Sequence, residues 1–113
     1  MNGSATPVWH VYIVRTRDGS LYTGVTTHVA RRLAEHLGED GRGARYLRGR
    51  APLEIAYRQR LGNRGLALRV EWRLKRRPRA DKMAIIAARP SRRALVRWLG
   101  VSDTRPQSRV RSG

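Results

Sequence analysis

Two apolar stretches separated by a short polar turn open the chain. WHVYIVR at residues 9–15 and SLYTGV at residues 20–25 are rich in aromatic and β-branched residues. Such residues favour strands because they pack well on a pleated, half-buried surface. The pair Asp18-Gly19 between the two stretches favours a tight turn. Together, the stretches and the turn predict a β-hairpin.

The length of the hairpin loop decides which side chains share a face of the sheet. A two-residue loop at Asp18-Gly19 would place the two tyrosines of the hairpin on opposite faces. A three-residue loop at 17–19, with its glycine in the left-handed conformation, would pair Thr16 with Ser20 and place both tyrosines on one face. The sequence permits both loops. The side chains that the longer loop brings to one face are Tyr12, Val14, Tyr22 and Gly24.

The rest of the chain shows helical periodicity, interrupted by one more strand. Leu53, Ile55 and Tyr57 recur at every second position within residues 52–61, which predicts a third strand. Apolar stripes at helical spacing and proline stops predict four helices around it. The predicted order is β-β-α-β-α-α-α, an α/β (α+β) fold in which helices flank a small, mostly antiparallel three-stranded sheet. The predicted helices cover residues 28–37, 64–77, 80–88 and 91–99.

Helix starts and core positions can also be predicted. Thr26 or Thr27 could cap the first helix, and Asn63 could cap the second, because their side-chain oxygens accept a bond from a backbone N–H group. We assign Trp72 and Trp98 to the core. The residues that form the apolar face of the second helix are Leu66, Ala67, Val70 and Leu74.

A chain of 113 residues suits one domain with a single modest core. Both ends differ in composition from the middle. MNGSATP at residues 1–7 is small and polar, which is typical of a flexible N-terminus. VSDTRPQSRVRSG at residues 101–113 lacks periodicity and is predicted to be a disordered basic tail. The domain is therefore expected to occupy residues 8–100.

Strong positive charge narrows the range of partners. The chain has 25 Lys and Arg residues against 8 Asp and Glu residues, a formal net charge of +17. Such an excess repels itself in the compact state, and a polyanion relieves this repulsion and releases counterions on binding. Nucleic acid is the commonest polyanion, and an acidic membrane surface is the competing partner.

Two absences favour nucleic acid over a membrane, and a third excludes chemistry that depends on cysteine. No stretch approaches the roughly 18 consecutive apolar residues of a spanning helix. The first residues lack the basic and apolar regions of a secretory signal. The chain has no cysteine, which excludes disulfides and cysteine-based zinc sites. We therefore expect a cytoplasmic protein that does not enter a membrane.

The helix predicted at residues 28–37 carries two pairs of charged or polar side chains. Arg32 and His36 lie four residues apart, at the border of its apolar stripe. Arg31 and Glu35 lie on the opposite side, where they can form an ion pair in solvent. The border position makes Arg32 and His36 the better candidates for a functional site.

Glu71 stands at the edge of the apolar face of the helix predicted at residues 64–77. It is the only acidic residue between Glu54 and Asp81, in a stretch that is otherwise strongly basic. It is therefore a candidate site residue. The plainer alternative is a surface ion pair, which would contribute little to stability. Its possible partners are Arg69, Arg73 and Lys75.

Taken together, these residues form a known constellation. Val11-Tyr12-Ile13 is followed ten residues later by Tyr22-Thr23-Gly24, and helices after the hairpin carry Arg32, His36 and Glu71. This order resembles the GIY-YIG nuclease family over about residues 9–88, and most of all its small single-domain branch. Val11 and Thr23 depart from the motif letters but are compatible with strands. Segments with counterparts in that branch are YTGVT, RR..EH, GRGARYLRG and LALRVEWRLKR.

The resemblance implies a metal-dependent endonuclease. In such proteins, the residue matching Glu71 binds a divalent cation, here Mg²⁺ or Mn²⁺. Arg32 would contact the scissile phosphate, and Tyr12 would help to activate the attacking water. Tyr22 would orient the nucleophile or hold the phosphate, and His36 would assist Arg32 or a proton transfer. Gly24 would keep the strand free of a side chain where the substrate approaches.

The expected reaction is hydrolysis of phosphodiester bonds in DNA, on structured or single-stranded forms, with low sequence specificity and with DNA repair or recombination as one setting. The glycine-rich segment at residues 38–50 would add backbone contacts and base stacking, although a flexible charged loop is nearly as good an interpretation. A nucleic-acid-binding module without useful turnover is the alternative function, and a basic ribosome-associated protein is a third. Besides Gly24, the expected nucleic-acid contacts are Arg31, Arg42, Arg45, Tyr46 and Arg48.

Overall fold

The computed structural model describes residues 7–36 and 53–102. Three strands and four helices follow one another in the predicted order, and their ends differ from the prediction by two residues at most, as is usual for element boundaries. The elements are β1 (Trp9–Arg15), β2 (Leu21–Thr26), α1 (Val29–His36), β3 (Glu54–Gly62), α2 (Arg64–Lys75), α3 (Arg79–Ala88) and α4 (Arg92–Leu99).

The sheet has the strand order β2-β1-β3, so β1 is central and β2 is an edge strand. Both pairings are antiparallel. The hairpin has the three-residue loop, because Thr16 N donates to the Ser20 carbonyl and Gly19 N donates to the Thr16 carbonyl, both at 2.9 Å. Gly19 has the left-handed φ of +88° that this loop requires. The longer of the two predicted loops is therefore the one that forms.

The loop fixes a register in which Tyr12 lies opposite Gly24 and Val14 lies opposite Tyr22. Side chains of directly opposed residues point to the same face of a sheet. The predicted shared face of the two tyrosines is therefore confirmed.

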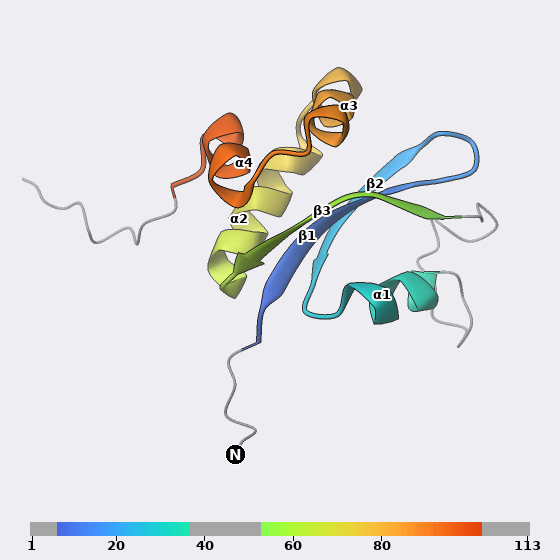
Figure 1. Ribbon diagram of the computed structural model, residues 1–113, viewed down its shortest axis with the longest axis horizontal. Coiled ribbons are helices and arrows are strands. Elements are labelled where there is room, and N and C mark those ends of the chain that lie inside the picture. The colour runs from blue at the N-terminus through green and yellow to red at the C-terminus, as the bar shows by residue number, and fades with distance from the viewer. Residues whose placement is uncertain (1–6, 37–52, 103–113) are drawn as a thin grey trace, which may run out of the picture.

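Helices α2, α3 and α4 cover one face of the sheet, and α1 lies on the other side (Figure 1). Val11 and Ile13 point toward the three helices and are fully buried there. Because successive residues of a strand alternate in direction, Tyr12 points to the α1 side. The four residues predicted to form the apolar face of α2 are all buried: Leu66, Ala67, Val70 and Leu74.

The helix starts differ in how well they match the prediction. The Asn63 side chain accepts a hydrogen bond from Leu66 N at 2.7 Å, so the predicted cap of α2 is confirmed. The Thr26 hydroxyl instead accepts from His28 N at 3.0 Å, which stabilises the turn before α1 rather than the first N–H groups within the helix. The His28 carbonyl accepts the first helical bond, from Arg32 N at 2.9 Å.

Two predictions about the core are wrong. Trp72 is 55% exposed, because it lies on the side of α2 opposite the buried face. Val101 was expected to begin a disordered tail, but it is buried and belongs to the core cluster. Trp98, also assigned to the core, is half-buried and packs against it. Residues 1–6 and 103–113, which hold most of the predicted flexible ends, lie outside the described residues.

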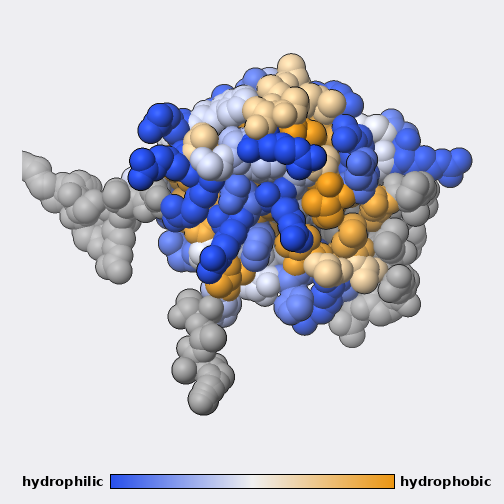
Figure 2. Space-filling view, viewed as in Figure 1, coloured by the Kyte–Doolittle hydropathy of each residue, from blue (hydrophilic) through white to orange (hydrophobic). Residues whose placement is uncertain are grey.

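Hydrophilic side chains cover much of the face seen in Figure 2, with patches of hydrophobic side chains exposed between them. Within the ranges that the structure describes, none of the helices has the length and apolar character needed to cross a lipid bilayer.

Candidate active site

Tyr12 is the centre of the candidate site, and its ring explains the glycine opposite it. A Cβ atom on Gly24 would lie 2.6 Å from Cζ of Tyr12, well inside contact distance. The tyrosine ring therefore lies across β2 at the position where a side chain would otherwise stand. The expectation that Gly24 leaves room for the substrate is corrected, because the tyrosine itself fills this space and is only 3% exposed.

Several side chains act electrostatically on the Tyr12 hydroxyl. Burial is the main cause that raises the pKa of Tyr12 well above its usual value, and the neighbouring Tyr22 raises it further. Arg32 lowers this pKa because its positive charge favours the phenolate, whereas the carboxylates of Glu71 and Glu35 oppose ionisation. Residues from β2, α1 and α2 therefore all influence the ionisation of one hydroxyl.

The charge of Glu71 acts on this hydroxyl from α2, which packs on the opposite face of the sheet. On one flank of α2, Arg69 and Arg73 donate to the Ser102 and Leu99 carbonyls, so this flank faces α4 and the segment after it. Glu71 lies on the other flank, and α2 packs over β2 and β1.

The site therefore forms at the open edge of the sheet. Tyr12 leans over the edge strand β2 from the α1 side, and Glu71 approaches that edge from the helix-covered side. The sequence predicted one shared patch. The two groups instead start from opposite faces, and the edge position of β2 is what lets the charge of Glu71 act on the tyrosine.

Both carboxylates of the site are ion-paired. Glu71 Oε2 lies 3.4 Å from Lys75 Nζ, which is one of the three partners considered from the sequence. Glu35 pairs with Arg31 at 4.0 Å, as expected, and also with Arg32 at 3.5 Å. Exposed pairs of this kind are weak, so they orient the side chains more than they stabilise the fold.

Sequence reasoning missed two arginines on the face of Tyr12. Arg58 lies directly opposite Tyr12 and Arg60 opposite His10, so both point to the α1 side of the sheet, and both are exposed. Burial lowers the pKa of His10, and the positive charges of Arg58 and Arg60 lower it further, which shows that the three groups are close. The alternation in YRQRL at residues 57–61 is the signal that could have revealed them.

The remaining predicted residues fall into two groups. Arg31 is exposed on α1. The side chain of His36, which ends α1, is outside the described part of the chain, and so is the whole basic segment at 37–52. The predicted contacts in that segment, which therefore stay predictions, are Arg42, Arg45, Tyr46 and Arg48.

The donor atoms at this edge limit the kind of metal that could bind. Among residues 7–36 and 53–102, no group of three or more His, Asp or Glu side chains is arranged to hold a metal ion. An ion at Glu71 could have waters among its ligands. Mg²⁺ commonly does so, since it often binds through one or two carboxylates and keeps several waters.

The constellation and the order of elements agree with a comparison against known protein families. A model described as the GIY-YIG catalytic domain matches residues 8–84, more than half of the chain. The chain belongs to the GIY-YIG family. This is a family of nucleases, and its members act on nucleic acid. The match includes Tyr12, Tyr22, Arg32 and Glu71.

Similar GIY-YIG relatives are small proteins that carry only a provisional family name. The chain is 50% identical over 86 residues to a UPF0213 protein of Nitratidesulfovibrio vulgaris, covering 76% of each chain. It is 42% identical over 88 residues to the UPF0213 protein YhbQ of Salmonella typhimurium, covering 78% of this chain and 86% of the relative. The suspected small single-domain branch is therefore confirmed.

One solved structure also matches. It is the solution NMR structure of a UPF0213 protein from Bacillus halodurans, with 32% sequence identity and a TM-score of 0.49. The match covers 84% of this chain and 99% of the other.

Proposed function

We propose that this GIY-YIG protein is a divalent-metal-dependent endonuclease that hydrolyses phosphodiester bonds in DNA. The observation that carries the proposal is that the Tyr12 ring lies over Gly24 of β2, and that the charges of Arg32 and Glu71, from two other elements, both act on its hydroxyl. A protein that only binds nucleic acid has no need of a carboxylate there, because a carboxylate repels phosphate.

Arg32 is proposed to bind the scissile phosphate. Its guanidinium can donate two parallel hydrogen bonds to phosphate oxygens, which the ammonium group of lysine cannot do. Glu35 lies 3.5 Å from this guanidinium and is only partly exposed. It can therefore hold Arg32 in place until a phosphate replaces it as the stronger partner.

Glu71 is proposed to hold Mg²⁺ or Mn²⁺. Its carboxylate is a suitable ligand for a hard cation, and its present partner, the half-exposed Lys75 ammonium, forms only a weak ion pair that a divalent cation can displace. When bound, such a cation lowers the pKa of a coordinated water and stabilises negative charge on the phosphoryl oxygens.

Tyr12 is proposed to position the attacking water and accept its proton. Its raised pKa keeps the hydroxyl protonated near neutral pH, which opposes the role of a base. Burial causes most of this shift, Tyr22 and the two carboxylates add to it, and Arg32 opposes it. Neutralising the carboxylate of Glu71 would remove one of these causes, so the basicity of Tyr12 depends on what Glu71 binds.

The substrate is proposed to be single-stranded, flapped or nicked DNA, cut with low sequence specificity, and DNA repair or recombination is a setting that would supply such forms. A small module with its charge spread widely mostly contacts the sugar-phosphate backbone of a nucleic acid. Such contacts position the nucleic acid without reading its sequence. The arginines that extend the site along β3 toward such a backbone are Arg58 and Arg60.

The test is a cleavage assay with matched variants. Labelled linear, flapped and nicked DNA and closed circular single strands are incubated with Mg²⁺, Mn²⁺ or chelator. Glu71→Gln and Tyr12→Phe are each expected to lower the cleavage rate about a thousandfold, the loss of about 4 kcal/mol of transition-state stabilisation.

The controls make the same chemical changes elsewhere. Glu54→Gln removes a carboxylate whose partner is Arg15, at 3.3 Å on the surface, and Tyr57→Phe removes a buried hydroxyl on the other face of the sheet from Tyr12. Both should cut at near the normal rate per folded molecule. Equal cutting by Glu71→Gln and Glu54→Gln would refute the metal assignment. Salt-dependent binding without cleavage of any substrate would favour the binding module.

A further inference from the structure

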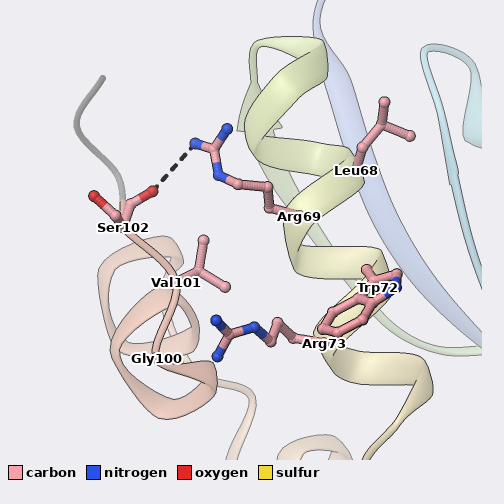
Figure 3. A pocket seen from close by; sticks show the side chains of 7 residues that line it. All are labelled: Leu68, Arg69, Trp72, Arg73, Gly100, Val101 and Ser102. Carbon is pink, nitrogen blue, oxygen red and sulfur yellow. Dashed lines mark hydrogen bonds between the residues drawn. The ribbon is translucent and has the colours of Figure 1, made fainter. Parts of the chain in front are cut away.

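Trp72 lies at an open groove that the proposed reaction does not use. The groove has a volume of about 560 Å³ and runs between α2 and the segment that follows α4 (Figure 3). Its lining combines apolar and cationic side chains, and none of the described residues that line it is acidic. The lining residues from α2 are Leu68, Arg69, Trp72 and Arg73, and those after α4 are 100–102.

The indole of Trp72 offers a free aromatic surface. The Arg76 guanidinium lies 4.1 Å from the ring centroid and covers one side of the ring. A single guanidinium covers only one face, and the residue remains 55% exposed. Leu68, one turn earlier on the same outward side of α2, is also exposed. An exposed tryptophan with an apolar neighbour usually marks a site of interaction.

The cationic side of the groove is held in place. Arg69 donates to the Ser102 carbonyl at 3.1 Å, and Arg73 donates to the Leu99 carbonyl at 3.2 Å. These bonds fix the two guanidinium groups along the flank of α2 while leaving other N–H groups of each fork available. The result is a flat apolar surface beside two positioned positive charges.

We infer that this groove binds an unpaired nucleobase, which stacks on the Trp72 indole while Arg69 and Arg73 contact the adjacent phosphates. Aromatic surfaces combined with a basic groove are the means by which proteins hold single strands without sequence preference. A paired base inside a duplex does not expose its face for such stacking. The charge of the chain, +17, is complementary to this ligand.

The position of the groove relates it to the candidate active site. Trp72 follows Glu71 directly in α2, and the two side chains diverge by about 100° around the helix. A strand that crosses the outward side of α2 can thus place a base on Trp72 and a neighbouring phosphate near Glu71. The inference deepens the proposed nuclease function and rests on it, because it identifies the substrate as one with an unpaired base next to the cleaved bond.

Binding measured in chelator tests the inference without relying on cleavage. The full chain is titrated into fluorescently labelled single-stranded oligothymidine, an abasic strand of equal length and charge, and a duplex. Trp72→Ala is expected to weaken binding of oligothymidine about tenfold and of the abasic strand and duplex less than about twofold. Trp72→Phe, which keeps an aromatic face, should recover most of the loss.

The matched control is Trp9→Leu, because Trp9 also has an arginine over its ring, Arg64 at 5.8 Å, but lies away from the groove. It should bind all three ligands normally. An equal loss of affinity for thymidine and abasic strands in Trp72→Ala would overturn the inference. So would a concentration-dependent dimer that Trp72→Ala converts to monomer, since the groove would then hold a second copy.

The outcomes separate this inference from the proposed function. Base-dependent binding lost in Trp72→Ala, together with no metal-dependent cleavage, would support the groove and reject the endonuclease. Cleavage that depends on Glu71 but proceeds equally well in Trp72→Ala, with unchanged affinity for single strands, would support the endonuclease and reject the groove.

Discussion

Tyr12 and Tyr57 lie on neighbouring strands, and both are buried, yet they belong to opposite faces of the sheet. Tyr57 pairs with Ile13 on the face covered by α2, α3 and α4, and its hydroxyl donates to the Pro90 carbonyl at 2.7 Å. Tyr12 points to the other face, and the charges of Arg32, Glu71 and Glu35 act on its hydroxyl. Burial is the main cause that raises the pKa of both.

The comparison indicates that the two faces of this small sheet have different roles. Most side chains on the helix-covered face are apolar, and the Tyr57 hydroxyl is satisfied there by a neutral backbone group, so their contribution is to stability. Side chains on the Tyr12 face bring positive and negative charges close to a buried hydroxyl, which costs stability and serves chemistry. Substitutions on the two faces should therefore separate stability from activity.

The largest effect on stability is expected at the centre of the helix-covered face. Ile13→Ala removes a fully buried side chain between β1 and the helices. The free energy of unfolding should fall by about 3 kcal/mol, through lost burial and the cavity that remains. Urea denaturation measures this, and cleavage per folded molecule should stay near normal. A large loss of activity in molecules that remain folded would contradict the separation of tasks.

Gly24→Ala is expected to affect both quantities. The added methyl group would collide with the buried Tyr12 ring, and overpacking should cost about 2 kcal/mol of stability. Displacing the hydroxyl by about 1 Å should lower the cleavage rate about a hundredfold. A double-mutant cycle with Tyr12→Ala tests the cause, because the alanine at position 24 should be nearly neutral once the ring is gone. Additive losses would show that the ring is not the reason for the glycine.

The raised pKa of Tyr12 predicts a pH effect with a definite sign. Below pH 10, the tyrosine is protonated in both the folded and the unfolded state, and its contribution to stability is fully present. Above pH 10, the unfolded chain loses this proton while the folded protein keeps it, so stability falls by about 1.4 kcal/mol per pH unit until the folded-state pKa is passed.

Urea denaturation at pH 9, 10 and 11 measures this slope. Tyr12→Phe should make it shallower by about 1.4 kcal/mol per pH unit in the alkaline range. Tyr57→Phe, on the other face, should also make it shallower, because the pKa of Tyr57 is raised as well. An unchanged slope in Tyr12→Phe would mean that Tyr12 ionises as easily in the folded protein as in the unfolded chain.

Local sequence signals were sufficient to predict the helices and strands of this fold. The periodicity of α2, the Asn63 cap and the Asp18-Gly19 turn depend on residues close together in the chain, and all three predictions are confirmed. The sequence left the choice between the two hairpin loops open. In the structure, the Asp18 side chain accepts a hydrogen bond from Ser20 N at 3.2 Å within the longer loop.

The two departures from the prediction have different causes. Trp72 was assigned to the core, although the helical spacing places it opposite Leu66, Val70 and Leu74. The meeting of Glu71 and Tyr12 at an open sheet edge depends on the strand order, which residue spacing does not determine.

The smallest effect is expected where a polar group interrupts the helix-covered face. Thr23 pairs with Ile13 and is buried, and its hydroxyl has no hydrogen-bond partner among the described residues. Removing a buried, unsatisfied hydroxyl relieves a desolvation cost, so Thr23→Val should raise the free energy of unfolding by about 1 kcal/mol.

Thr26→Val is the matched control on the same strand. That hydroxyl accepts from His28 N, so its loss should lower stability by about 1 kcal/mol. If urea denaturation shows that both variants lower the free energy of unfolding, the Thr23 hydroxyl has a partner in the folded protein.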